Sequence, residues 1–400
     1  MGADFFEVTV NVLKMLLIFL VMVQLVPVLV WVERRGSAFI QNRFGPNRIG
    51  PLGLTQLLAD AVKFLFKEEF VPPKSHALLY YAAPVLALIP GAIAFGAIPL
   101  SVPIHIEPFS VDLFGLVTWL KGSPWTSGEY IFKFQSYDLG GLGIIFVLAV
   151  SSLGAYALLL AGWGSHNKYS LFGALRASAQ MISYELAMGL SLVGILMLYQ
   201  SFSFQHMIGL QQGPLHFWFF GKEILINALP NWGIFYQPLG FILFATATFA
   251  ETNRTPFDLP EAEGELVAGY HTEYGGLKML MFYIGEYGHM MVASALMTTF
   301  YFGGYELPHL FGYNLTAILT NAIHNSFGTG NLGNIMVALH FFVILLVKIL
   351  FFLWVFIWVR WTLPRFRYDQ LMDLGWKTML PWALANVLVT SLFILYGGGQ

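Results

Sequence analysis

The chain has 400 residues, of which 57% are hydrophobic and only 10% are charged, and its formal net charge is -2. This composition excludes an ordinary soluble domain, and the charge balance offers no basic surface for nucleic acid. The chain has no cysteine, so it forms no disulfide and ligates no iron–sulfur cluster through thiolates.

Long apolar segments predict an all-α integral membrane protein, because a helix of about 20 apolar residues spans a bilayer. The first segment is too long for the apolar region of a signal peptide and lacks a basic start, so we expect it to be retained as a transmembrane helix. Eight segments qualify, at about 5–32, 77–101, 139–163, 171–199, 231–251, 276–303, 333–361 and 377–396. Together they predict a single polytopic membrane domain over residues 1–400.

The connection between the first two predicted spans, residues 33–76, contains one further helical pattern. In PLGLTQLLADAVKFLF, residues 51–66, the apolar side chains follow one helical face, whereas Asp60 and Lys63 mark the other. The segment is too short and too polar to cross a bilayer, so it predicts an amphipathic helix that lies along the membrane interface.

The distribution of lysine and arginine predicts the orientation in the membrane. Fifteen of the 20 basic residues fall in or beside the connections between spans 1 and 2, 3 and 4, 5 and 6, and 7 and 8. Because basic residues favour the cytoplasmic side, the N-terminus is expected on the outer, periplasmic side. The connections at 33–76 and 252–275 are then cytoplasmic.

Several ionisable residues fall within the predicted spans. Glu185 is near the middle of the fourth span, and Glu286 shares a helical face of the sixth with Tyr283 and His289. Lys348 lies near the middle of the seventh. Charges at bilayer depth are costly, so such groups face a polar interior and often handle protons or ions. The alternative is an inert buried pair that only orients helices.

The stretch ETNRTPFDLPEAEGELVAGYHTE, residues 251–273, gathers acidic residues beside the membrane. Its carboxylates are Glu251, Asp258, Glu261, Glu263, Glu265 and Glu273. Two unit charges about 10 Å apart at an effective dielectric near 20 interact by roughly 1.7 kcal/mol, or about one pKa unit. Such carboxylates titrate as a coupled set. With Glu185 and Glu286, they suggest a proton path from the cytoplasmic face into the membrane.

Two long motifs give the sequence a family resemblance. AETNRTPFDLPEAEGELVAGYHTEYGG, followed by FYIGEY, resembles one signature of the H subunit of respiratory complex I, and ERRGSAFIQNRFGPNRIGPLGLTQLLADAVKFLFKE resembles the other. The resemblance covers essentially the whole chain. It implies a membrane subunit of a proton-pumping NADH:quinone oxidoreductase that lines the quinone tunnel and couples quinone reduction to proton translocation.

The resemblance also implies roles for particular residues. The residues implied to line the quinone tunnel are Glu33, Arg34, Arg35, Phe39, Gln41, Asp60 and Ala61. Those implied to connect the quinone site to the proton pump are Glu185, Glu251, Arg254, Asp258, Glu261, Glu263, Glu265, Glu273 and Glu286. No residue is expected to ligate a metal.

The implied setting is the bacterial inner membrane, as a multi-pass subunit among other membrane-arm and peripheral-arm subunits. Quinone would be the substrate, ubiquinone being one candidate, while flavin and iron–sulfur clusters would belong to partner subunits. This chain itself would hold no redox cofactor.

Three other interpretations remain open from the sequence. The chain could be the membrane subunit of an energy-converting hydrogenase, a stand-alone ion transporter that uses Glu185, Glu286 and Lys348, or a passive anchor. The absence of a convincing internal repeat disfavours the transporter. A passive anchor would not require buried glutamates.

Overall fold

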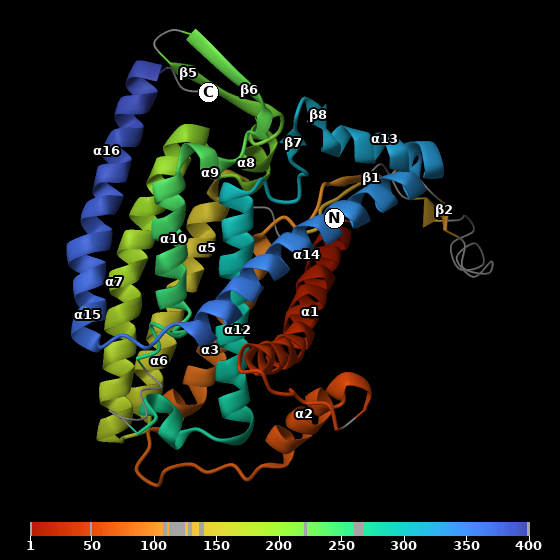
Figure 1. Ribbon diagram of the computed structural model, residues 1–400. Helices are drawn as coiled ribbons and strands as arrows, with labels where there is room; N and C mark the ends of the chain where they lie inside the picture. The colour runs from red at the N-terminus through yellow and green to blue at the C-terminus, as the bar shows by residue number, and fades with distance from the viewer. Residues whose placement is uncertain are drawn as a thin grey trace.

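The computed structural model describes residues 2–48, 50–106, 110–111, 125–126, 130–135, 140–219, 222–259 and 267–397. Within them the fold is a bundle of long helices with small hairpins at one end (Figure 1). The first half contains α1 (Gly2–Ile40), η1 (Pro51–Gly53), α2 (Gln56–Phe66), α3 (Ala77–Ala97), η2 (Gly140–Leu142), α5 (Gly143–Ser151), α6 (Leu153–Gly164) and α7 (Lys168–Tyr199). The second half contains α8 (Phe204–Leu210), α9 (Gly233–Tyr236), α10 (Pro238–Glu251), η3 (Gly269–Glu273), α12 (Gly276–Tyr301), α13 (Leu315–Phe327), α14 (Asn331–Thr362), α15 (Tyr368–Asp373), the π-helical turn η4 (Leu374–Met379) and α16 (Leu380–Gly397).

The prediction of an all-α membrane protein is confirmed. Among the described residues, six helical segments are long and apolar enough to cross a membrane: Asn11–Ile40, Ala77–Ala97, Gly140–Gly164, Lys168–Tyr199, Asn331–Thr362 and Tyr368–Tyr396. The other two predicted spans correspond to α9 with α10 and to α12. Helix α10 has 14 residues, or about 21 Å at 1.5 Å per residue, which is shorter than the apolar thickness of a bilayer.

Helix α12 lies at the centre of the bundle. This position explains why it is less apolar than the six helical segments named above. It packs against α3, α14, α1 and α10 (Figure 1). Every residue from Met290 to Tyr301 is buried. Because protein rather than lipid surrounds it, α12 accommodates Glu286 and His289, whose polarity lowers its mean hydropathy.

Some element boundaries differ from the predicted ones. Helix α1 continues to Ile40, so Glu33, Arg34, Arg35 and Phe39 lie on its last turns rather than in a loop. The predicted third span is divided at Ser152 into α5 and α6. The final helical run begins at Tyr368 and passes through the π-helical turn η4 before α16.

The predicted amphipathic helix is present as α2, preceded by η1. It has no buried residue and stands apart from the bundle, below the C-terminal end of α1 (Figure 1). Contacts with α1 and α12 hold it there. Its exposed apolar side chains include Leu58, Val62 and Leu65, as expected for a helix at a membrane interface.

The opposite end of the molecule carries the short strands. Among the described residues they are β1 (Ile104–Ile106), β2 (Ser110–Val111), β3 (Trp125–Thr126), β4 (Tyr130–Phe132), β5 (Pro214–Phe219), β6 (Lys222–Pro230), β7 (His309–Leu310) and β8 (Tyr313–Asn314). They pair antiparallel as β1–β4, β2–β3, β5–β6 and β7–β8. The connections predicted on the two sides of the membrane therefore lie at opposite ends of the bundle (Figure 1).

The strand-bearing end also holds the C-terminus of α12. Lys348 of α14 donates from Nζ to the backbone carbonyls of Phe302 (2.8 Å), Gly304 (2.8 Å) and Glu306 (2.6 Å). Helix C-termini leave carbonyl groups unsatisfied, and a cation there complements the helix dipole. Lys348 is therefore a cap for α12 that a different helix supplies.

We predict that Gly285→Ala destabilises the bundle, because α3 and α12 meet there without space for a side chain. A Cβ at Gly285 would lie 2.5 Å from the carbonyl oxygen of Ala87, a backbone atom that cannot move cheaply. The expected loss is about 1–3 kcal/mol of folding free energy, measured as a lower thermal unfolding midpoint in detergent. Gly189→Ala on α7 is the control, since its Cβ would meet no atom within 4 Å. Equal midpoints for the two variants would contradict the prediction.

Candidate functional site

The carboxylate of Glu33 joins three helices inside the bundle. It lies near the C-terminal end of α1 and is 7% exposed. Arg360 of α14 donates from Nη1 to Glu33 Oε1 at 2.6 Å, and the hydroxyl of Tyr287 on α12 donates to Oε2 at 2.5 Å. Two charge-assisted hydrogen bonds thus compensate the loss of water around this buried carboxylate.

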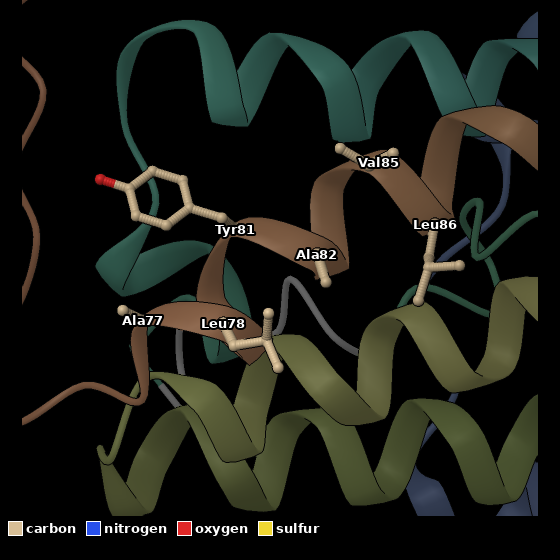
Figure 2. A pocket seen from close by; sticks show the side chains of 6 residues that line it. All are labelled: Ala77, Leu78, Tyr81, Ala82, Val85 and Leu86. Atoms are coloured by element: carbon tan, nitrogen blue, oxygen red, sulfur yellow. The ribbon is translucent and has the colours of Figure 1, made fainter.

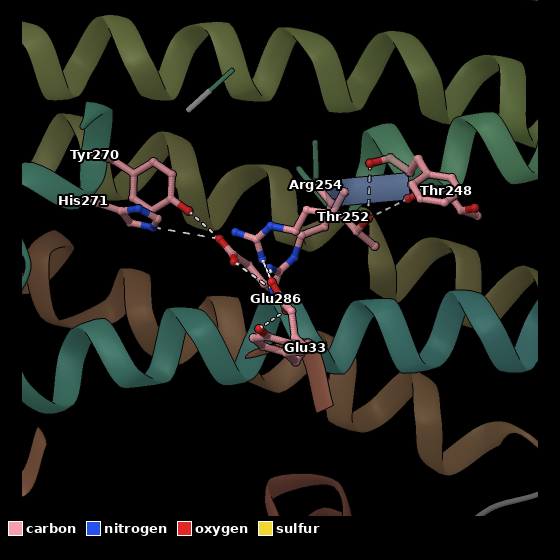
Figure 3. Close-up of polar contacts among 10 residues, drawn as sticks. Glu33, Thr248, Thr252, Arg254, Tyr270, His271 and Glu286 are labelled. Carbon is pink, nitrogen blue, oxygen red and sulfur yellow. Dashed lines mark hydrogen bonds and ion pairs between the residues drawn. The ribbon is translucent and has the colours of Figure 1, made fainter. Parts of the chain in front are cut away.

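Arg254 lies between Glu33 and a second carboxylate, Glu286 (Figure 3). Its Nη1 is 3.9 Å from Glu33 Oε2, and its Nη2 is 3.7 Å from Glu286 Oε2. The guanidinium also lies over the ring of Tyr287, 4.2 Å from the ring centroid. Since Arg254 is only 5% exposed, its positive charge balances the two acidic groups in an environment of low dielectric constant.

Glu286 has further polar neighbours from the segment that precedes α12. The buried Tyr270 donates its hydroxyl to Glu286 Oε1 at 3.1 Å, and His271 Nε2 lies 3.9 Å from the same oxygen (Figure 3). Both residues belong to η3. The network therefore runs continuously from α1 through the segment after α10 to α12 and η3.

Two contacts position the segment after α10. The side chain of Gln180 on α7 is buried and donates from Nε2 to the carbonyls of Ala250 and Phe257, both at 2.8 Å. Asp258 is 3% exposed and accepts a hydrogen bond from Arg365 Nη2 at 2.9 Å. These contacts fix the backbone on both sides of Arg254, so its guanidinium is held in place before any charge changes at the site.

Glu251, Glu286 and His289 border one small cavity. Glu251 is the last residue of α10 and is 8% exposed. The cavity has a volume of about 30 Å³, and its other lining residues are Ala87, Gly154, Leu158, Met181, Thr252, Asn253, Tyr270, Phe282 and Gly285. That volume is sufficient for a water molecule. Glu185 on α7 does not line it.

The remaining described acidic residue of the predicted coupling set lies apart from Arg254. The carboxylate of Glu273 accepts a hydrogen bond from Asn167 Nδ2 at 2.6 Å, and its backbone carbonyl accepts one from Tyr80 at 2.7 Å. Glu273 thus ties η3 to α3 and to the start of α7. Glu261, Glu263 and Glu265 lie outside the described residues.

The predicted quinone-tunnel residues gather where α1 meets α2. Arg34 Nη1 donates to Asp60 Oδ2 at 2.6 Å, and this ion pair holds α2 against the end of α1. The Arg35 guanidinium donates to the carbonyl of Leu52 at 2.8 Å. The side chain of Gln41 accepts a hydrogen bond from Arg43 Nε at 2.6 Å. Ala61, next to Asp60 on α2, is half-buried.

A hollow of about 410 Å³ opens beside these residues. Its lining residues are Arg35, Phe39, Asn42, Arg43, Phe44, Gly45 and Asn47. Phe39 is 80% exposed and Phe44 is 91% exposed, so the surface combines bare aromatic rings with two guanidinium groups. An aromatic and cationic surface of this kind suits contact with another protein or with an amphipathic ligand. Of the predicted tunnel residues, Arg35 and Phe39 border the hollow.

A separate groove of about 680 Å³ follows the first half of α3, between α12 and the pair α6 and α7 (Figure 2). Its lining residues are Ala77, Leu78, Tyr81, Ala82, Val85 and Leu86. None of the residues predicted for quinone or proton handling borders it. Its apolar side chains are those of a lipid-facing helix surface.

Several residues of the network are absent from the sequence-based prediction, namely Arg360, Tyr287, Tyr270, His271, Arg365 and Gln180. Tyr287 follows Glu286 directly, and Tyr270 and His271 lie within the acidic stretch, so proximity in sequence could have indicated them. Arg360 and Arg365 lie in or beside the connection between spans 7 and 8, and the prediction used them only in the count of basic residues that gives the membrane orientation. Sequence reasoning also placed Glu33 and Arg254 in different sets, whereas the structure joins them through one buried ion pair.

The fold and site define a multi-pass membrane protein with a buried carboxylate–guanidinium network that reaches one end of its bundle. The chain belongs to the family described as NADH dehydrogenase, whose model matches residues 13–391. It is 62% identical over 396 residues to the H subunit of the NADH-quinone oxidoreductase of Bdellovibrio bacteriovorus, covering 99% of this chain and 98% of the relative. It is 40% identical to an H subunit of the same type of enzyme from Koribacter versatilis (98% and 99% covered) and 41% identical to one from Geobacter metallireducens (97% and 98% covered).

We predict that Arg254→Leu strongly destabilises the protein, because Glu33 and Glu286 would remain buried without their shared cation. Breaking a buried ion pair in this way costs about 3–5 kcal/mol of folding free energy. The measurement is the thermal unfolding midpoint in detergent. Lys377→Ala is the control, since Lys377 pairs with Asp373 at 2.8 Å on an exposed surface, where ion pairs contribute little. An Arg254→Leu midpoint as high as that of the control would contradict the prediction.

Proposed function

We propose that this chain is the membrane subunit of a proton-translocating NADH:quinone oxidoreductase in the bacterial inner membrane. In this proposal quinone passes the region where α1 meets α2, and the buried carboxylates couple its reduction to proton translocation. The observation that carries the proposal is the Glu33–Arg254–Glu286 network, together with the family to which the chain belongs. It connects the end of α1, where Arg35 and Phe39 border the hollow, to the interior carboxylates.

The proposed coupling is electrostatic. Quinone reduction takes up two electrons and two protons, so the charge near the quinone changes during turnover. At an effective dielectric near 20, two unit charges about 4 Å apart interact by roughly 4 kcal/mol. A change in the charge of Glu33 would therefore change how strongly Arg254 interacts with Glu286. The proton affinity of Glu286 would change as a result.

The chain supplies no thiolate ligand for a redox cluster, so in this proposal the electrons come from partner subunits. The hollow with Phe39, Phe44, Arg35 and Arg43 is a surface on which a peripheral subunit could dock. Flavin and iron–sulfur clusters would reside in such partners, and the lipid bilayer would surround the long helices.

Purification of the tagged chain in mild detergent tests the assembly. We expect flavin and iron to co-purify with it, together with NADH:quinone activity that a quinone-site inhibitor blocks. Nickel and iron without quinone activity would instead support the energy-converting hydrogenase. A metal-free chain without partners would overturn the proposal and favour a stand-alone transporter.

We predict that Glu286→Gln lowers NADH-driven proton translocation in the assembled complex by at least about tenfold. Glutamine preserves the shape of the side chain but cannot carry the charge that Arg254 balances, and positioned acid–base groups contribute about 10²–10⁴-fold to rate. Translocation is measured with a pH-sensitive dye in vesicles, normalised to flavin. The matched control is Asp373→Asn, which makes the same chemical change on the exposed surface. Full translocation in the Glu286→Gln complex would contradict a role in coupling.

A further inference from the structure

His289 on α12 is a titratable group in the interior that none of the predicted sets includes. It lies three residues after Glu286, so both side chains emerge from the same face of the helix. Its ring borders the cavity that Glu251 and Glu286 also border. The imidazole therefore borders the same cavity as two carboxyl groups from different helices.

The wall of this cavity contains polar atoms that the described residues do not satisfy. Both His289 Nε2 and Asn253 Oδ1 are buried and have no hydrogen-bond partner within the part of the chain that the structure describes. Buried polar atoms are nearly always satisfied by protein or by ordered water. With a volume of about 30 Å³, the cavity can hold the water that would satisfy them.

The space beside the imidazole depends on a glycine. A Cβ at Gly154 on α6 would lie 3.3 Å from His289 Nε2 and 3.6 Å from Cε1 of the same ring. Any larger residue at position 154 would crowd the ring. The bare backbone of Gly154 thus leaves Nε2 at the edge of the cavity rather than within a closely packed core.

Glu251 and Glu286 need an intermediate if a proton is to pass between them. Glu251 ends α10, whereas Glu286 lies within α12, and among the described residues no hydrogen bond joins their carboxyl groups directly. Glu286 is already bonded to Tyr270 and faces Arg254. The imidazole of His289 can take up and release a proton, whereas the side chains of Asn253 and Met181 in the same wall cannot.

We propose that His289 is a proton-transfer residue that links Glu251 to Glu286 through water in this cavity, an inference that rests on the proposed function. A proton leaves the Glu251 carboxyl for a water molecule, which gives one of its own protons to His289 Nε2. The imidazolium then returns a proton through water to the Glu286 carboxylate. Each step breaks one O–H or N–H bond and forms another, so no co-reactant is required.

The test compares proton translocation in assembled complexes that carry His289→Gln or His289→Leu. Glutamine can hydrogen-bond to water without taking up a proton, and leucine provides apolar packing alone. We expect NADH-driven proton translocation per flavin to fall at least about tenfold in both. We also expect a larger solvent deuterium isotope effect in the glutamine variant, because proton transfer would become rate-limiting. A role in packing alone would not increase this isotope effect.

Two control variants distinguish loss of the His289 imidazole from a general effect of substitution on the complex. His340→Gln removes a histidine of α14 whose Nδ1 lies 2.7 Å from the carbonyl of Met336, outside the cavity. His324→Gln removes a histidine of α13, which also lies outside the cavity. Both should translocate protons like the parent complex. Parental translocation and an unchanged isotope effect in either His289 variant would overturn the proposal.

Gly154→Ala gives an independent test if the His289 variants do not assemble. Its methyl group would lie 3.3 Å from Nε2, so the imidazole must shift within the cavity, while no titratable group is removed. We expect slower translocation, and an unchanged rate would overturn the proposal.

Failure of the proposed function itself would give a different result. The parent complex would then not couple quinone reduction to proton translocation. If Glu286→Gln is impaired but the His289 variants are not, only this inference fails.

Discussion

The buried guanidinium of Arg254 is the interaction on which the interior of this protein depends. It balances Glu33 from α1 and Glu286 from α12, and Arg360 of α14 supplies a second cation to Glu33. Buried charges are tolerated only when their partners are correctly placed. The relative positions of α1, α12 and α14 are therefore constrained by charge as well as by apolar packing.

The acidic stretch beside the membrane has more than one structural role. Asp258 is paired with Arg365, and Glu273 anchors η3 through Asn167, so these two carboxylates stabilise the segment that presents Arg254. Glu251 instead borders the cavity with Glu286 and His289. Neighbouring acids in one sequence motif thus differ in their surroundings, and only some face the interior where a proton could be transferred.

Hydropathy was sufficient to locate the helices because length and apolarity are local properties of the chain. The pairing of Glu33 with Arg254 could not be predicted in this way, since 221 positions separate the two residues and their contact depends on how α1 lies against the segment after α10. Hydropathy also did not predict the division of the third span at Ser152 or the central position of α12. The resemblance identified residue types with implied functions, but the side-chain contacts that join them required coordinates.

Lys348 has a consequence for the mechanics of the bundle. It fastens α14 to the end of α12 at Phe302, while Arg360 and Tyr287 fasten the same two helices to Glu33. The attachment points on α12 are 15 residues apart, or about 23 Å at 1.5 Å per residue. Contacts at two distant points oppose sliding and rotation of α14 against α12. Changes of charge and protonation at Glu33 and Arg254 can therefore act within a pair of helices whose relative position is fixed at both ends.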